Sequence, residues 1–215
     1  EDGKENFVAS DIPAILGFTR QAYLIDNGEM VVATEDAIEV TTIAGKAVDK
    51  PVFHVQWDAR MAEKGGHKHF MIKEIFEQPE ALRQTLADRI VGRELALNLE
   101  GLNLRDSELK RLRKIVVIAC GTASYAGMAG QYAIEKLCGV PVVVDVASEL
   151  QHRECLFAKD TLGIAISQSG ETADTLQAIR MARRRGAKVL AVTNVIGSSV
   201  ARESDGVLYI HAGPE

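Results

Sequence analysis

The chain has 215 residues, of which 47% are hydrophobic and 26% charged, and its formal net charge is −5 at pH 7. This composition is ordinary for a soluble globular protein with a sizeable core. The acidic balance argues against a nucleic-acid-binding protein, whose surface would be basic. No stretch approaches the roughly 18 apolar residues of a membrane-spanning helix, so we predict no membrane partner.

The cysteine content predicts reduced thiols and no disulfide framework. Cys120, Cys138 and Cys155 are odd in number and widely spaced, and they form no Cys-x-x-Cys pair. Such a pattern is typical of a cytosolic protein. The opening residues, EDGKENFVAS, lack the basic and apolar regions of a signal peptide. We therefore expect a cytoplasmic protein.

The sequence of residues 12–57 predicts short β-strands. In residues 21–34, Asn27-Gly28 separates two strand-like segments, and this pair is the strongest short-range signal for a β-hairpin. Residues 37–48 predict a second hairpin that turns at Ala44-Gly45. Isolated hairpins are only marginally stable, so we interpret this region as part of an antiparallel β domain.

A polar, glycine-bearing segment follows at residues 58–70, and we interpret it as a linker. It contains His67 and His69, which would share one side of an extended strand. Two histidines without a third ligand nearby are weak evidence for a metal, so we predict no metal site.

Two helical patterns follow the linker, at residues 71–78 and 80–98. Proline is tolerated in the first turn of a helix but not in its interior. Pro79 therefore predicts a break, with a new helix starting after it.

From Lys114 onward the sequence alternates strand and helix patterns. The segment KIVVIAC is continuous and apolar, as expected for a parallel strand covered on both faces. The strand patterns lie at residues 114–120, 140–148, 161–166, 187–194 and 206–213, and the main helical patterns between them at 124–139, 171–186 and 198–203. This alternation predicts an α/β fold: a doubly wound, parallel five-stranded sheet with right-handed crossovers, preceded by the partial antiparallel β segment.

Ligands in an open parallel sheet bind outside the carboxyl ends of the strands, and three predicted strand ends carry polar loops. These loops are CGTAS at 120–124, SQSGET at 167–172 and TNVIGSS at 193–199. The SQSGET loop consists of Ser167, Gln168, Ser169, Gly170, Glu171 and Thr172. It offers three hydroxyls, an amide and a glycine, and a helix that begins near Glu171 would direct its free N–H groups to the same place. We interpret the loop as a site for a compact anion, above all phosphate.

Two other interpretations of the SQSGET loop are weaker. Ser169 could be the N-cap of the following helix, but one cap needs one hydroxyl, which leaves Ser167 and Gln168 unexplained. A nucleotide site is disfavoured because neither Gly-x-Gly-x-x-Gly nor a Gly-Lys-[Ser/Thr] P-loop is present.

SQSGETADTLQAIR after an apolar strand, with ACGTASYAGM ahead of it, resembles the sugar isomerase (SIS) domain. EKGGHKHFMIKEIFEQPEALRQTL is similar to the interdomain linker and first helices of the glutamine–fructose-6-phosphate amidotransferase family, also called glucosamine-6-phosphate synthases. ENFVASDIPAIL and the hairpins after it resemble the closing part of that family's glutaminase domain. The resemblance implies a glutaminase-type segment in residues 1–57 and a first SIS subdomain, a sandwich with leading helices, in residues 71–215.

The resemblance also implies the site residues. It assigns contacts with the phosphate and sugar of fructose 6-phosphate or glucosamine 6-phosphate to Thr122, Ala123, Ser124, Ser167, Gln168, Ser169 and Thr172. Many family members have Ser directly after the Thr of Cys-Gly-Thr. Here Ala123 occupies that position and a hydroxyl returns only at Ser124, so Ala123 can contribute a backbone contact alone.

No catalytic residue is implied in this chain. The family's glutaminase cysteine and the ring-opening and proton-transfer groups of its second SIS subdomain have no counterpart here. We therefore interpret the chain as an internal fragment of an enzyme that makes glucosamine 6-phosphate and glutamate from fructose 6-phosphate and glutamine. The resemblance implies no cofactor, and it implies a homodimer.

Two alternatives stay open. SIS modules also serve as sugar-phosphate sensors in transcription regulators, which would place a helix-turn-helix ahead of residue 114; the hairpins and acidic balance argue against it. Residues 71–215 could instead form a purely structural or dimerisation unit, which would self-associate without any response to ligand.

Overall fold

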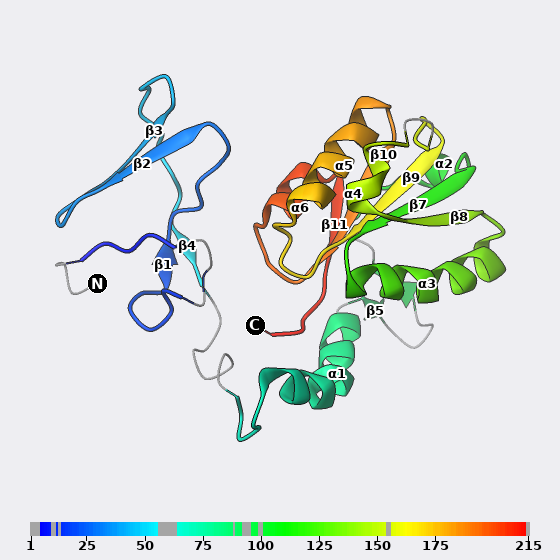
Figure 1. Cartoon of the computed structure of the whole chain (residues 1–215), viewed down its shortest axis with the longest axis horizontal. Coiled ribbons are helices and arrows are strands. Elements are labelled where there is room, and N and C mark those ends of the chain that lie inside the picture. Colours follow the sequence, from blue (N-terminus) through cyan, green and yellow to red (C-terminus); the bar gives the residue numbers. More distant parts are fainter. Residues whose placement is uncertain are drawn as a thin grey trace. The chain divides into compact units, whose positions relative to one another are not determined.

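The chain divides into two compact units, Glu1–Phe76 with Gly213–Glu215, and Glu77–Ala212. Figure 1 shows their elements in a computed structural model. Cys155 and residues 58–63 of the predicted linker lie outside the described part of the chain. The structure describes residues 5–9, 12, 14–55, 64–87, 89–91, 96–98, 101–153 and 156–213.

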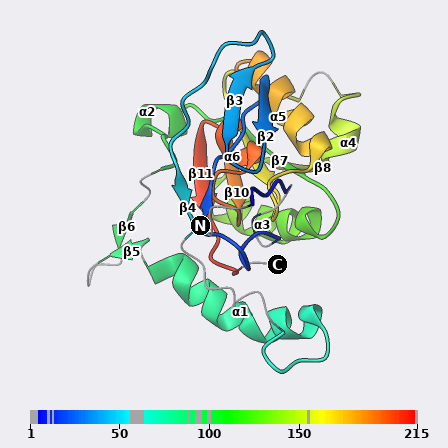
Figure 2. The same ribbon diagram turned by 90° about the vertical axis from the view of Figure 1, so that its left-hand side faces the viewer.

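The N-terminal unit contains two small antiparallel sheets. Strands β2 (Glu29–Ala33) and β3 (Ile38–Thr42) pair with each other and lie side by side in Figures 1 and 2. Strand β1 (Gln21–Ala22) pairs with β4 (Phe53–His54). The second predicted hairpin is present in short form, because Thr42 N–H donates to the Lys46 carbonyl at 2.8 Å.

The first predicted hairpin is wrong, although its turn forms. Glu29 N–H donates to the Asp26 carbonyl at 3.1 Å, but the residues ahead of this turn pair with β4 and not with β2. The turn also has a long-range partner. Lys50 Nζ lies 2.6 Å from Asp26 Oδ2 and 2.7 Å from Glu29 Oε2, so the turn is held by a residue distant in sequence.

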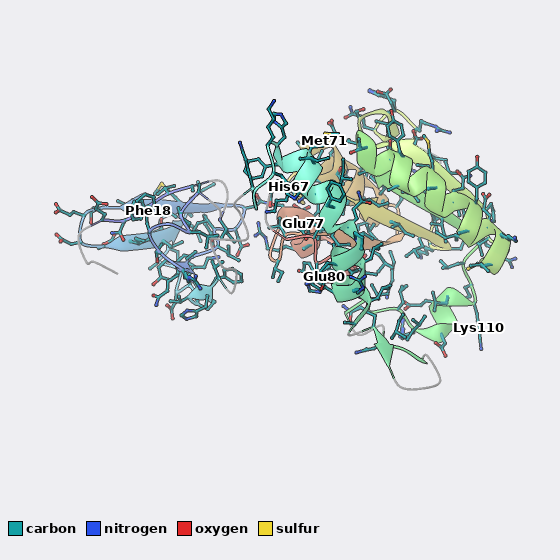
Figure 3. The ribbon with its side chains drawn as sticks, turned by 90° about the horizontal axis from the view of Figure 1, so that it is seen from below. Phe18, His67, Met71, Glu77, Glu80 and Lys110 are labelled. Carbon is teal, nitrogen blue, oxygen red and sulfur yellow. The ribbon has the colours of Figure 1, made fainter. Side chains whose placement is uncertain are left out.

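Helix α1 (Phe70–Ala87) is continuous, so the predicted break at Pro79 is wrong. Pro79 is exposed within the helix, and without an N–H it cannot donate the i→i−4 hydrogen bond of its position. Figure 3 labels Met71, Glu77 and Glu80 along this helix.

The helix predicted to reach residue 98 ends at Ala87, and a short hairpin of β5 (Ile90–Val91) and β6 (Ala96–Leu97) follows. Arg89 explains the end of the helix. Its guanidinium donates to the Thr85 carbonyl, which would otherwise accept the next helical N–H, and to the Tyr209 carbonyl at 2.7 Å.

Unit Glu77–Ala212 is built around one parallel sheet, and the predicted fold class is confirmed. Its strands lie in the order β11-β10-β9-β7-β8. They are β7 (Lys114–Ala119), β8 (Val142–Val146), β9 (Thr161–Ile166), β10 (Lys188–Thr193) and β11 (Gly206–Tyr209). The helices are α2 (Asp106–Leu109), α3 (Thr122–Cys138), α4 (Ala147–Leu150), α5 (Ala173–Arg184) and α6 (Ser199–Glu203).

Successive residues of β7 face opposite layers, as the continuous apolar pattern requires. Val116 and Ile118 pack in the core cluster that contains Ile179 of α5 and residues of α4 and α6. Val117 belongs to the opposite cluster, against which Ile134 of α3 packs. Figure 1 shows α3 on one side of the sheet and α5 and α6 on the other. The sheet is thus doubly wound.

Helix α3 lies close to the sheet at Gly127. A Cβ at this position would lie 2.7 Å from Val117 Cγ1 and 3.3 Å from Val144 Cγ1, whereas at Gly130, on the same helix, no atom lies within 4 Å. We expect Gly127→Ala to destabilise the unit by about 1–3 kcal/mol through overpacking. The control Gly130→Ala should stabilise it by about 0.5–1 kcal/mol through backbone entropy. Urea unfolding checks both values, and equal effects of the two substitutions would contradict this close packing.

Glu108 connects α2 to the amino end of β10. It accepts hydrogen bonds from the backbone N–H of Arg105 at 2.9 Å and from Lys188 Nζ at 3.0 Å, and it pairs with the Arg105 guanidinium at 3.1 Å. These partners, the Arg105 side chain first, lower the pKa of Glu108 from 4.5 to about 2.

Because the pKa of Glu108 is lower in the folded chain, its stabilising effect is complete above about pH 4.5 and is lost as the pH falls toward about 2. We expect the chain to be more stable than the Glu108→Gln variant at neutral pH, with the difference narrowing over that acid range. Thermal unfolding of both proteins across this range measures the difference. A difference that does not depend on pH would show that the carboxylate charge contributes nothing.

Candidate functional site

The candidate site lies at the carboxyl ends of β7 and β9. Ala119, the last residue of β7, pairs with Ile166, the last residue of β9. The CGTAS and SQSGET loops therefore leave the sheet from neighbouring positions, on strands spaced about 4.8 Å apart. The CGTAS loop leads into α3 on one face of the sheet, and the SQSGET loop leads into α5 on the other. Strands β7 and β9 thus flank the topological switch point, where ligands of doubly wound sheets bind.

Hydroxyl groups shape the SQSGET loop from within. Ser167 is 5% exposed, and its Oγ accepts the Gly170 N–H at 3.1 Å and lies 3.2 Å from Thr172 Oγ1. Ser169 is exposed, and its Oγ accepts the Glu171 N–H at 3.3 Å. Both serines therefore set the turn, and Ser169 has further hydrogen-bonding capacity toward solvent.

Helix α5 begins later than predicted, and Ser169 is not its N-cap, which removes the weaker, capping interpretation of this residue. The N-cap is Thr172, whose backbone is extended, and the first helical residue is Ala173. Gly170 has φ of +68°, a left-handed conformation that an α-helix does not accept, so the helix starts beyond it. The hydroxyl of the N-cap residue therefore forms no conventional helix cap, which favours the interpretation of SQSGET as a ligand-binding loop.

The CGTAS loop makes a second tight turn. Gly121 has φ of +55° and ψ of −136°, and it is the N-cap of α3. Thr122 is exposed at the start of the helix and Ala123 is partly buried. Ser124 is buried, and its Oγ donates to the Gly121 carbonyl at 2.6 Å, so this hydroxyl proton is engaged within the turn.

The first turns of α3 and α5 supply the electrostatics of the site. Helix α3 follows β7 after a short turn and α5 follows β9 after the SQSGET loop, so both N-termini carry their partial positive charge at the same edge of the sheet. Within the described part of the chain, neither helix is capped by the side chain of its own N-cap residue. Their N–H groups can bind an anion without any cationic side chain.

The loop between β10 and α6 supports the SQSGET loop from the other side. The Gln168 carbonyl accepts the Asn194 N–H at 3.0 Å and the Thr193 hydroxyl at 3.3 Å, and the Gly170 carbonyl accepts the Val200 N–H at 2.9 Å. Sequence reasoning marked this loop only as polar and assigned it no role. Its contacts are mostly between backbone groups, for which side-chain patterns give no signal.

The described residues contain no group of three or more His, Cys, Asp or Glu placed to hold a metal ion. His67, which the sequence analysis considered as a metal ligand and did not assign, stacks on Phe76 with ring centroids 5.8 Å apart (Figure 3 labels His67). Of the helices that the structure describes, none has the length and apolar character needed to cross a bilayer.

The parallel five-stranded sheet with hydroxyl-bearing loops at its switch point has the fold of a SIS domain. Residues 108–215 match the model of the SIS domain, and the chain belongs to this family. The structure is similar to the C-terminal domain of glucosamine-fructose-6-phosphate aminotransferase from Francisella tularensis, with a TM-score of 0.61 and 38% identity over 71% of this chain and 42% of that one.

Two curated relatives share a more particular name, glutamine–fructose-6-phosphate aminotransferase (isomerizing). That of Clostridium acetobutylicum is 50% identical over 100% of this chain, and that of Symbiobacterium thermophilum is 52% identical over 98% of it. The chain spans about a third, 35%, of each relative's length. The resemblance inferred from the motifs is confirmed.

Gly170 is required by both its conformation and its surroundings. An added Cβ would lie 2.1 Å from Ser198 Oγ and 2.9 Å from Thr193 Oγ1. Gly139 has nearly the same φ, +66°, with no atom within 4 Å of an added Cβ. We expect Gly139→Ala to cost about 1–2 kcal/mol from backbone strain alone, and Gly170→Ala to cost about 1–3 kcal/mol more from steric overlap. Urea unfolding of the two variants measures the difference, and equal losses would contradict the close approach of the two loops.

Proposed function

We propose that the SQSGET and CGTAS loops bind the phosphate of a hexose 6-phosphate, either fructose 6-phosphate or glucosamine 6-phosphate. The observation that carries this proposal is the convergence of two helix N-termini and the hydroxyl-bearing loops at the switch point of the sheet. The contacts expected from the resemblance, at Thr122, Ala123, Ser124, Ser167, Gln168, Ser169 and Thr172, all lie on these two loops.

The two loops differ in what they offer. Ser124 is buried and its proton is engaged, so it supports the turn and can act on a ligand only as an acceptor. Thr122 and Ser169 are exposed, and their hydroxyls can donate directly to phosphate oxygens.

The free-energy contributions of the available groups favour reversible binding of the sugar phosphate. A helix terminus at an exposed site contributes about 0.3–1 kcal/mol, whereas each hydrogen bond to a charged group contributes about 1.5–3 kcal/mol. Neither loop carries Lys or Arg. Hydroxyl and N–H donors therefore supply most of the affinity, which suits a metabolite that must be bound and released.

We further propose that the chain is the sugar-phosphate-binding part of an enzyme that converts fructose 6-phosphate and glutamine to glucosamine 6-phosphate and glutamate. The support is the name that the relatives carry, together with identity over essentially the whole chain. This chain would supply binding and orientation of the substrate. We assign it no catalytic residue and no cofactor.

The alternative of a sugar-phosphate-sensing regulator has less support. Ahead of residue 114, the described helices α1 and α2 are separated by the β5–β6 hairpin, so these two do not form a helix-turn-helix. A purely structural unit would not explain why two helix starts of the described chain that lack side-chain caps lie beside the exposed hydroxyls of Thr122 and Ser169.

The location and assembly of the protein are also proposals. The described cysteines Cys120 and Cys138 are free, which supports a reducing, cytoplasmic location. A homodimer, implied by the resemblance, is supported by large exposed side chains on α3: Tyr125, Tyr132 and Leu137 are 66%, 75% and 82% exposed.

Calorimetric titration of the 215-residue chain with glucosamine 6-phosphate tests the binding proposal. We expect saturable binding that is absent with unphosphorylated glucosamine, and at least a tenfold loss of affinity in Ser167→Ala/Ser169→Ala, since about 1.4 kcal/mol is tenfold and the variant removes two hydroxyls from the loop.

The matched control is Thr161→Val, at the opposite end of the same strand. Thr161 Oγ1 accepts the Ala158 N–H at 3.2 Å, much as Ser167 Oγ accepts that of Gly170. This variant should lose stability but keep its affinity. Binding of glucosamine equal to that of its phosphate, or equal loss in the control, would refute the proposal.

A further inference from the structure

A carboxylate stands within the proposed anion-binding loop. Glu171 lies between Gly170 and Thr172, and a negative charge directed at a bound phosphate would weaken binding. The side chain has a different partner, because Glu171 Oε1 accepts the Ser199 N–H at 2.8 Å. Ser199 is the first residue of α6, so the carboxylate interacts with the N-terminus of that helix.

Helix α6 depends on the SQSGET loop for its cap. Its own N-cap residue, Ser198, makes no side-chain cap hydrogen bond, and Ser198 Oγ is buried without a partner among the described residues. The first two helical N–H groups, those of Ser199 and Val200, donate to the Glu171 carboxylate and the Gly170 carbonyl at 2.8 and 2.9 Å. The cap that serine would ordinarily provide thus comes from another segment.

The same hydrogen bonds hold the loop in place. Backbone groups anchor it at Gln168 and Gly170, and these contacts do not depend on any side chain. Glu171 adds the side-chain anchor directly before Thr172. Its own N–H donates to Ser169 Oγ at 3.3 Å, so the position of residue 171 also sets the direction of that exposed hydroxyl.

We infer that Glu171 is a positioning residue of the sugar-phosphate site. By capping α6 it fixes the SQSGET loop with Ser169 and Thr172 available to the ligand, and it directs its own charge toward helix N–H groups instead of the bound anion. This inference rests on the proposed function, since it names how the same site is held.

Two substitutions of Glu171 separate hydrogen bonding from charge, with glucosamine 6-phosphate as the calorimetric probe of the 215-residue chain. Glu171→Ala removes the anchor, and we expect the Kd to rise about 5- to 30-fold. Glu171→Gln keeps an oxygen that can accept the Ser199 N–H, and we expect its Kd to stay within about threefold of that of the unsubstituted chain. Rescue by the amide is the signature of positioning.

Glu108→Ala is the matched control. Glu108 also caps a short helix from its side chain, accepting the Arg105 N–H, but it contacts the amino end of β10 and not the SQSGET loop. We expect it to lower the unfolding temperature without changing the Kd. An unchanged Kd in Glu171→Ala, or a Kd in Glu171→Gln that rises as much as in Glu171→Ala, would overturn the inference. Tighter binding by Glu171→Gln would do so too, because it would mean that the charge acts on the ligand.

Amide hydrogen exchange without ligand separates failure of this inference from failure of the proposed function. We expect faster exchange at Gly170, Ser199 and Val200 in Glu171→Ala, and unchanged exchange in Glu171→Gln. If the unsubstituted chain binds no sugar phosphate, the proposed function fails, and exchange alone still decides whether Glu171 holds the loop. Unchanged exchange in Glu171→Ala would overturn the anchor.

Discussion

The parallel pairing of β7 with β9 is the constraint on which the rest of the structure depends. It brings together two segments that are far apart in the sequence and aligns their last residues, Ala119 and Ile166. Because β7 and β9 are parallel, α3 and α5 both begin at one edge of the sheet, although they pack on opposite faces. The proposed anion site depends on this pairing, since each loop alone supplies only one helix terminus.

Close backbone approach is the second requirement of the site. Gly170 lies against Ser198 and Thr193, so the SQSGET loop and the loop after β10 meet where no larger residue fits. Gly127 also permits a close approach, in this case of helix α3 to Val117 of the sheet. These positions explain why small residues recur near the carboxyl end of the sheet, although the two glycines act differently: Gly170 also needs its left-handed backbone, whereas Gly127 is helical.

The electrostatics of the site rely on dipoles and hydroxyls in place of ions. Two basic residues of α5, Arg180 and Arg183, lie away from the loops and pair with carboxylates. Arg180 donates to Glu203 Oε2 at 2.6 Å, and Arg183 lies 3.4 Å from Asp205, so these cations fasten α5 to the segment around α6. Glu171 is likewise paired away from the helix ends of the site, because its carboxylate accepts the Ser199 N–H at the start of α6. The positive helix ends are left to act on a ligand.

Residue patterns along the chain were enough to predict the five parallel strands, the order of the helices between them and the loops of the proposed site. Those features follow from continuous apolar segments and the polar loops that separate them, which are local properties of the chain. The pairing of β1 with β4 and the Lys50–Asp26 ion pair are visible only in the folded structure, because each joins residues distant in sequence. The end of α1 likewise depends on Arg89, which reaches the Tyr209 carbonyl. The start of α5 and the partner of Glu171 depend on Gly170 meeting α6. Each of these results comes from a contact between distant segments, and periodicity along one segment carries no information about such a contact.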